Sequence, residues 1–147
     1  KFENNNLIFN TDFRSPKIKC LMSNNNTYFL FYDPKFKIQL RIKTVSKINN
    51  QNGVTKISWG GTRLSSRKCY LAEKNPTSKT LIAEDSIPNH LEGKNPSISE
   101  SEKGYKNFSV IENKIKVIDW LFLKSSGHRR LQIKFESSKP NFQWLIP

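Results

Sequence analysis

Three side chains near the start of the chain have the types and spacing of an anion site. Thr11, Ser15 and Lys17 surround the dipeptide Ser15-Pro16, which is typical of a helix start because Ser caps helices and Pro is tolerated at the first helical position. The free N–H groups and the dipole of a helix N-terminus favour a phosphate. A Ser15 that only caps the helix explains the local pattern equally well.

Two further groups have the chemistry to hold a planar ligand. Gln39 and Arg41 share the polar face of a predicted strand, where an amide both donates and accepts hydrogen bonds. A solvated sheet face is the simpler interpretation. Trp120 lies in another predicted strand and Arg130 in the next, so we expect a ring and a guanidinium side by side across a hairpin. A core Trp and a surface Arg would give the same pattern.

Other chemistries lack the partners that they need. Ser65-Ser66-Arg67-Lys68 has the S-x-x-K spacing, but no S-D-N or K-T-G follows. His90 and His128 form no H-x-x-x-H pair, and Cys20 and Cys69 form no CxxC pair. The sequence therefore predicts no metal site and no serine acyltransferase site.

The elements that must position these residues are mostly strands. The segment 27–32 is aromatic and is expected to be a buried strand, and Glu112-Asn113 is expected to be a turn. Strands are predicted at 7–10, 27–32, 36–42, 108–111, 115–123, 129–135 and 142–146. Short helices are predicted from Ser15-Pro16 with Ile18, Leu21 and Met22 on one face, at 54–59 and 64–72, and from a Ser97–Glu100 capping box, with a loop at 73–96. This order favours a mainly β (α+β) fold, a closed or nearly closed antiparallel barrel with short helices at its rim.

Length and composition limit the class of protein. The chain has 147 residues, which is enough for one domain, and 35% of them are hydrophobic. Its longest apolar runs are far shorter than the roughly 20 residues of a membrane span. Two isolated cysteines and no basic-then-apolar opening segment predict a reducing, cytoplasmic setting.

The net charge of +13 suggests a nucleic-acid or membrane partner, but its origin weakens that interpretation. The chain has 19 Lys, 16 Asn and 14 Ile against 6 Arg, the bias of an A- and T-rich genome, and the lysines are scattered. A single-strand nucleic-acid module would need aromatic residues among Lys and Arg on one open sheet face. The polar face of residues 37–43 has no aromatic residue, which disfavours nucleic acid.

Four groups of motifs in this order make the chain recognisable. Together they resemble the pyridoxamine 5'-phosphate oxidase-like family of FMN-binding split barrels, in a flavoprotein branch distinct from the oxidase proper. The motifs are Thr11-Asp12-Phe13-Arg14-Ser15-Pro16-Lys17, Phe31-Tyr32-Asp33-Pro34 with Gln39-Leu40-Arg41, Ser65-Ser66-Arg67-Lys68-Cys69-Tyr70-Leu71, and Asp119-Trp120-Leu121 through Gly127-His128-Arg129-Arg130 to Trp144-Leu145-Ile146-Pro147.

The resemblance implies a homodimer with FMN in a cleft between its subunits. It assigns the flavin phosphate and ribityl chain to Thr11, Ser15 and Lys17, and the ring to Gln39. It further implies a C-terminal contribution to the cofactor from Trp120 and Arg130.

Two departures from the family matter. The family's phosphate site also uses an Arg-bearing strand upstream of the region that matches Lys1, so we expect this chain to lack its N-terminal strands. Where the oxidase proper grips its substrate with Tyr, Arg and Ser, this chain has Ser58, Thr62 and Ser66, which disfavours vitamin B6 oxidation.

The sequence thus predicts a single FMN-binding split-barrel domain over residues 1–147, an FMN-dependent oxidoreductase with no assigned catalytic residue or substrate. Two alternatives remain open. One is a non-catalytic binder of FMN or a related cofactor, and the other is a basic single-strand nucleic-acid module.

Overall fold

The structure, a computed structural model, describes residues 1–3, 5–135 and 139–147. Seven strands run through these residues: β1 (Phe2–Glu3), β2 (Asn6–Asp12), β3 (Asn26–Asp33), β4 (Ile38–Asn50), β5 (Phe108–Phe122), β6 (Arg129–Lys134) and β7 (Asn141–Leu145). The helices are α1 (Pro16–Ser23), α2 (Gly53–Gly60), α3 (Leu64–Arg67) and α4 (Ile98–Ser101). Three 3-10 turns accompany them, η1 (Lys68–Leu71), η2 (Asn89–Leu91) and η3 (Glu102–Asn107).

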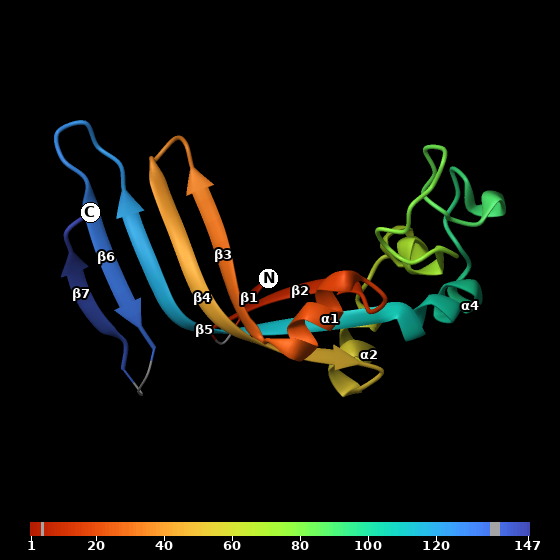
Figure 1. Cartoon of the computed structure of the whole chain (residues 1–147). Helices are drawn as coiled ribbons and strands as arrows, with labels where there is room; N and C mark the ends of the chain where they lie inside the picture. The colour runs from red at the N-terminus through yellow and green to blue at the C-terminus, as the bar shows by residue number, and fades with distance from the viewer. Residues whose placement is uncertain (4, 136–138) are drawn as a thin grey trace. The chain divides into compact units, whose positions relative to one another are not determined.

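The strands form one sheet in the order β1-β2-β5-β4-β3, and β6 and β7 extend it from β5 (Figure 1). The pairs β1–β2, β3–β4, β5–β6 and β6–β7 are antiparallel. The predicted antiparallel β class with short flanking helices is therefore confirmed.

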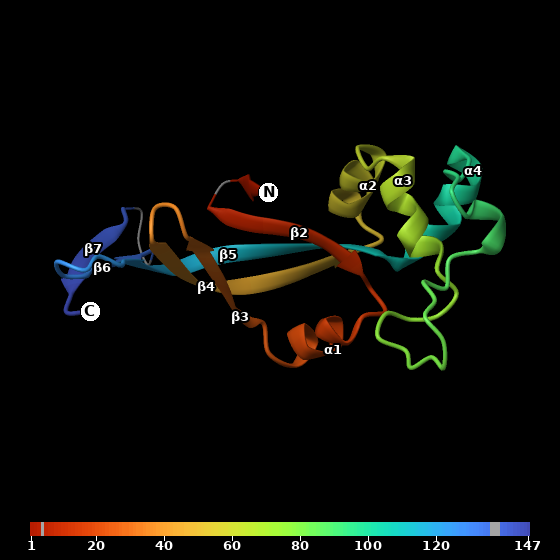
Figure 2. The ribbon, with the colours of Figure 1, turned by 90° about the horizontal axis from the view of Figure 1, so that it is seen from above.

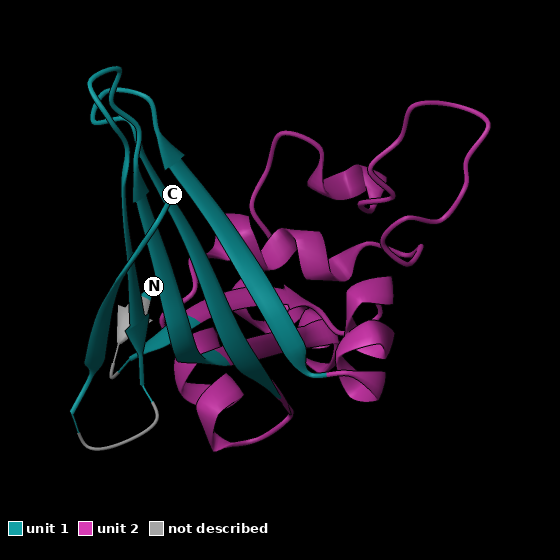
Figure 3. Ribbon diagram, turned by 60° about the vertical axis from the view of Figure 1, so that its left-hand side comes forward, with its two compact units in different colours: residues 1–7, 25–47, 113–147 teal, residues 8–24, 48–112 magenta. Residues whose placement is uncertain are grey.

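The chain divides into two compact units, shown in different colours in Figure 3. Unit 1 contains residues 1–7, 25–47 and 113–147, and unit 2 contains residues 8–24 and 48–112. Strands β2, β4 and β5 each contribute residues to both units. All four α-helices of the described chain, which are labelled in Figure 2, belong to unit 2. The single domain over 1–147 stays a prediction.

Unit 2 has a dense aromatic core. Trp59, Tyr70, Phe108 and Val110 are all buried, and Phe108 is fully enclosed. The Trp59 ring lies 5.0 Å from the Phe108 ring and 5.7 Å from the Tyr70 ring, between centroids. Gly104 belongs here because a Cβ at this position would lie 3.1 Å from the Cβ of Tyr70. Trp59 of α2 and Tyr70 of η1 thus pack on Phe108 of β5.

A second core cluster lies under α1. Ile18 and Leu21 are buried with Ile111. Met22, predicted to share their face, is instead 63% exposed. One residue advances a helix by about 100°, which takes Met22 away from the face defined by the other two. The first helix is therefore confirmed, but its buried face is narrower than predicted.

Unit 1 is a sheet without helices of its own in the described chain. The strand predicted at 27–32 is confirmed as β3, but the prediction that it is buried is wrong. Tyr28 is 70% exposed, and Leu30, Phe31 and Tyr32 are exposed too. β3 is the last strand in the described order of the sheet.

The predicted turn at Glu112-Asn113 is also wrong, because β5 runs unbroken through it. Asn113 is fully buried, and its amide is satisfied in place. Its Oδ1 accepts from Ser46 Oγ at 2.7 Å, and its Nδ2 donates to Leu7 O at 2.7 Å. A polar side chain with buried partners therefore continues a strand where its type alone predicts a turn.

The capping residues match the predictions in part. Ser97 caps α4 by accepting from the N–H of Glu100 at 3.1 Å, but the Glu100 carboxylate pairs with His90 instead of reaching back. The helix predicted at 64–72 is divided into α3 and η1. The loop predicted at 73–96 is confirmed, with η2 as its one helical turn among the described residues. No helix in the described chain has the length and apolar character to cross a membrane.

Candidate functional site

The start of α1 contains a buried hydroxyl without a partner. Ser15 is the N-cap residue, yet its side chain makes no capping hydrogen bond. It is 5% exposed, and its Oγ has no hydrogen-bond partner among the described residues. Thr11, near the end of β2 and four residues before Ser15, is buried as well. A buried polar group without a partner is costly, which makes this hydroxyl a candidate ligand contact.

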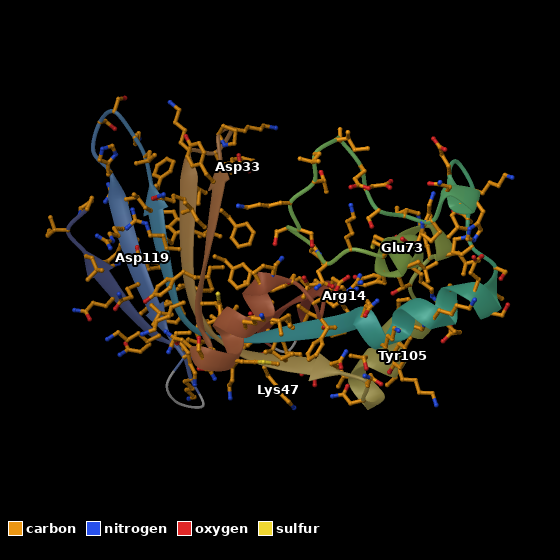
Figure 4. All side chains as sticks on the ribbon, turned by 45° about the vertical axis from the view of Figure 1, so that its right-hand side comes forward. Arg14, Asp33, Lys47, Glu73, Tyr105 and Asp119 are labelled. Atoms are coloured by element: carbon orange, nitrogen blue, oxygen red, sulfur yellow. The ribbon has the colours of Figure 1, made fainter. Side chains whose placement is uncertain are left out.

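Two cations flank this helix start, and they differ in availability. Arg14 (labelled in Figure 4) is held in place, because its Nε and Nη2 donate to Asp12 and its Nη1 donates to Ala72 O at 2.9 Å. Lys17 is exposed, and its ammonium lies 5.9 Å from the centre of the Phe9 ring. Thr11, Ser15 and Lys17 therefore lie within one short segment of unit 2, with Lys17 as its exposed charge.

Gln39 lies on β4 in unit 1, half-buried and opposite Tyr32 of β3. Its Oε1 accepts from Arg41 Nη2 at 3.3 Å. The prediction that Gln39 and Arg41 share one face of the strand is confirmed. Within the described residues, the amide N–H₂ of Gln39 donates no side-chain hydrogen bond.

The prediction that Trp120 and Arg130 lie side by side is wrong. In the β5–β6 register Trp120 is opposite Leu131, and Arg130 is opposite Leu121. Because opposite residues of an antiparallel pair share a face and successive residues alternate, Trp120 and Arg130 project from opposite faces. Sequence spacing across the hairpin could not fix this, since a shift of one residue exchanges the faces.

Arg130 is bound to a carboxylate on its own face. Its Nε donates to Asp119 Oδ1 at 2.9 Å and its Nη2 to Asp119 Oδ2 at 2.6 Å (Asp119 is labelled in Figure 4). This two-point hydrogen bond and the carboxylate charge raise the pKa of Arg130 further above its ordinary value. A ligand at Arg130 would therefore have to share the guanidinium with Asp119 or replace Asp119 as its partner.

Trp120 belongs to an exposed apolar surface that we call the uncharged face. Its ring is stacked on Phe122 at 6.1 Å and meets the edge of Trp144 at 6.4 Å, between centroids. Trp144 is 65% exposed and Phe142 is 61% exposed. Cross-strand pairing defines the face as Ile118, Trp120, Leu131, Ile133, Phe142 and Trp144, and the pair of Phe122 and Arg129 lies next to it on the same side of the sheet.

The positions that match the oxidase's substrate grip carry no cation. Ser58 is in α2, Thr62 donates to the Ser58 carbonyl at 2.8 Å, and Ser66 is exposed in α3. Arg67 next to Ser66 is buried. Its planar guanidinium lies 4.6 Å from the Trp59 ring centre and makes hydrogen bonds to four groups of unit 2. It is therefore a structural residue.

Sequence reasoning missed a cavity of about 450 Å³ in unit 2. Its walls come from segments far apart in the sequence, so no single motif indicates it. Arg14, Tyr70, His90, Glu100 and Lys103 line it with others. A hydrogen bond from His90 lowers the pKa of Glu100, and burial raises the pKa of Tyr70. Among the described residues, no group of His, Cys, Asp and Glu is arranged to hold a metal ion.

Comparisons with known proteins identify the fold. No protein-family model matches the sequence, and no curated protein matches it significantly. A pyridoxamine 5'-phosphate oxidase-related, FMN-binding protein from Nostoc punctiforme PCC 73102 matches with a TM-score of 0.77 and 16% identity, over 100% of this chain and 77% of that chain. PhzG from Burkholderia lata 383, solved with tetrahydrophenazine-1-carboxylic acid, matches with a TM-score of 0.73 and 14% identity, over 100% and 71%.

At such identities the likeness establishes the fold. The chain has the split-barrel fold of pyridoxamine 5'-phosphate oxidase-related proteins, and the predicted resemblance is confirmed at that level.

Proposed function

We propose that the chain is an FMN-binding flavoprotein of the pyridoxamine 5'-phosphate oxidase-like family and acts as an oxidoreductase. The fold is that of a protein described as FMN-binding. The observation that carries the proposal is the buried Ser15 hydroxyl without a partner at the start of α1. In this proposal FMN supplies the redox chemistry, and the protein supplies binding, orientation and electrostatics.

The phosphate end of FMN is assigned to Thr11, Ser15 and Lys17. A phosphate oxygen would accept from the Ser15 hydroxyl and from the backbone N–H of Lys17, because Pro16 has no N–H and the N–H of Ile18 donates to Ser15 O at 3.0 Å. Lys17 adds a positive charge, and no acidic residue lies in that first turn. The donors present therefore fit a phosphate.

The flavin ring is assigned to Gln39 and Trp120, both in unit 1. The free amide N–H₂ of Gln39 can donate to a ring acceptor, while Trp120 offers an aromatic surface. Arg130 stays a predicted contact, but it acts from the face opposite to Trp120 and shares its guanidinium with Asp119. One subunit therefore cannot place both side chains against the same side of a ring.

A homodimer is the second part of the proposal. The uncharged face exposes the aromatic rings of Phe142 and Trp144, and Arg129 lies next to it on the same side of the sheet; an apolar centre with a polar rim is the composition of an interface. A second copy of the chain would cover this face and bring Trp120 to the subunit boundary. The free, exposed thiols of Cys20 and Cys69 support a reducing, cytoplasmic location.

Vitamin B6 phosphates are not the proposed substrates. Ser58, Thr62 and Ser66 offer hydroxyls but no positive charge for a substrate phosphate. We expect the FMN-loaded protein to form no hydrogen peroxide from pyridoxamine 5'-phosphate. Turnover of this compound would show that another cation holds its phosphate.

Titration with FMN tests the proposal. We expect quenching of flavin fluorescence on binding, and about tenfold weaker binding by Ser15→Ala, because one charge-assisted hydrogen bond is lost. Ser109→Ala is the matched control, since Ser109 is the other buried hydroxyl without a partner in the described chain. No binding by the wild type, or equal losses in both variants, would overturn the assignment.

A further inference from the structure

The β3–β4 ladder of unit 1 carries aromatic and cationic side chains on one face. The register places Tyr28 opposite Lys43, Leu30 opposite Arg41 and Tyr32 opposite Gln39. Opposite residues of an antiparallel pair project from the same side of a sheet. We call this surface the mixed face, and it consists of Tyr28, Leu30, Tyr32, Arg41 and Lys43. Gln39, on the same side at the end of the ladder, is the residue proposed above for the flavin ring. The aromatic residues that strand 37–43 lacks are thus supplied by its neighbour.

The rings of the mixed face are open to solvent. Tyr28 is 70% exposed and Tyr32 is 55% exposed, with Leu30 at 66% between them. The two tyrosines are four residues apart on one strand, which separates them by about 13 Å. Sheet-based RNA-binding modules stack two or three bases on aromatic side chains of such an open face.

The cations of the mixed face have no acidic partner. Arg41 donates a hydrogen bond to Gln39 Oε1, and neither Arg41 nor Lys43 forms an ion pair among the described residues. Asp33, the acidic residue of β3 (Figure 4), is opposite Ile38 and projects from the other face. Its Oδ1 accepts from the N–H groups of Lys35 and Phe36. The positive charge on the mixed face is therefore left for an external anion.

The turn between β3 and β4 also has an exposed ring next to a cation. Phe36 is 58% exposed, and the ammonium of Lys35 lies 5.5 Å from its ring centre. A ring therefore lies next to a cation both in the ladder, at Tyr28 and Lys43, and in the turn, at Phe36 and Lys35. Stacking on such rings contributes about 1–3 kcal/mol per base, and adjacent cations bind the phosphates.

We propose that the mixed face binds single-stranded nucleic acid, a function beyond the proposed flavin chemistry. Exposed rings would stack on bases, Arg41 and Lys43 would contact the backbone, and the net charge of +13 would attract the polyanion over a distance. A second copy of the chain fits this face poorly. Symmetric pairing would bring two sets of uncompensated Arg41 and Lys43 together.

Fluorescence anisotropy with labelled oligo-dT and oligo-U of about 12 nucleotides tests the proposal, since one sheet-based site covers roughly 4–16 nucleotides. We expect saturable binding of at least one probe and weaker binding of duplex DNA of the same length. Tyr28→Ala should weaken binding about tenfold, and Tyr28→Phe should restore it because stacking needs the ring and not the hydroxyl.

Phe31→Ala is the matched control, because Phe31 is an exposed ring on the other face of the same strand. It should leave the affinity for both probes unchanged. Circular dichroism and FMN titration of each variant show whether the fold and the proposed flavin site are intact, so loss of oligonucleotide binding is separable from failure of the flavin proposal.

Three results would overturn the proposal. The first is no binding of either probe. The second is binding that Arg41→Gln weakens but Tyr28→Ala does not, which would indicate a surface that attracts polyanions by charge alone. The third is dissociation of a dimer by Tyr28→Ala in sedimentation velocity, which would assign the face to a second copy of the chain.

Discussion

The two units differ in the solvent exposure of their aromatic side chains. Unit 2 encloses Trp59 and Phe108 within its own core, at 4% and 0% exposure. Unit 1 leaves Tyr28 and Trp144 at 70% and 65% exposure. Unit 2 contains all four described α-helices, whereas the described residues of unit 1 form strands and no helix. The aromatic residues of unit 2 therefore stabilise the fold, and those of unit 1 are available for ligands and partners.

The largest expected effect comes from emptying the core of unit 2. Phe108→Ala leaves a cavity next to Trp59 and Tyr70, and such substitutions cost about 3–5 kcal/mol. Urea unfolding followed by circular dichroism measures the loss. Tyr28→Ala in unit 1 should change the free energy of unfolding by no more than about 0.5 kcal/mol. Comparable losses in the two variants would remove the distinction between the units.

Arg67→Lys tests how much the hydrogen bonds of Arg67 in the unit 2 core contribute to the free energy of unfolding. The guanidinium donates to the Trp59 carbonyl at 2.6 Å, to Thr62 O at 3.1 Å and to the Glu102 carboxylate at 2.8 Å. A Lys ammonium cannot reproduce this planar set, so we expect a loss of about 2 kcal/mol in the free energy of unfolding.

Arg63→Lys, on the exposed residue before α3, is its control and should be nearly neutral in the same urea titration. An Arg67→Lys protein as stable as the wild type would mean that the network is dispensable and that Arg67 is free for another role.

The strands and the first helix of the fold could be predicted from local patterns. The alternation from Ile38 to Ile42 and the Ser15-Pro16 start are properties of neighbouring residues, so they can be read from a single sequence. The division of β5 into two strands was wrong for a non-local reason. Asn113 is typical of turns, but Ser46 Oγ and Leu7 O, both distant in sequence, satisfy its amide within a strand.

The candidate site divides in the same way. The segment from Thr11 to Lys17 is local, and its position at a helix start follows from the sequence. The faces of Trp120 and Arg130 depend on the β5–β6 register, which the sequence of the hairpin does not determine. The mixed face also depends on a register, because Tyr28 and Lys43 meet only through the β3–β4 pairing.

Charging the uncharged face of unit 1 should give the next largest effect. Trp144→Glu places a carboxylate among apolar rings that a second copy would bury, and loss of a central aromatic anchor costs about 2 kcal/mol or more, roughly a 30-fold weaker dimer. Sedimentation velocity over a dilution series measures this. Tyr28→Glu on the mixed face is the control and should leave dimerisation unchanged. A wild-type monomer at all concentrations would contradict the proposed homodimer.

The smallest expected effect concerns the mixed face of unit 1 and the salt dependence of its affinity for oligonucleotides. If Lys43 contacts a phosphate, Lys43→Gln should lower the slope of log affinity against log salt by about 0.7, the value for one single-strand phosphate contact. At moderate salt its affinity for oligo-dT should fall only about threefold, because the rings of Tyr28 and Tyr32 remain. Lys134→Gln removes a charge from β6, outside the mixed face, and should leave the slope as in the wild type. Equal slopes for Lys43→Gln and wild type would show that Lys43 contributes only long-range attraction, and the anion contact would then pass to Arg41 alone.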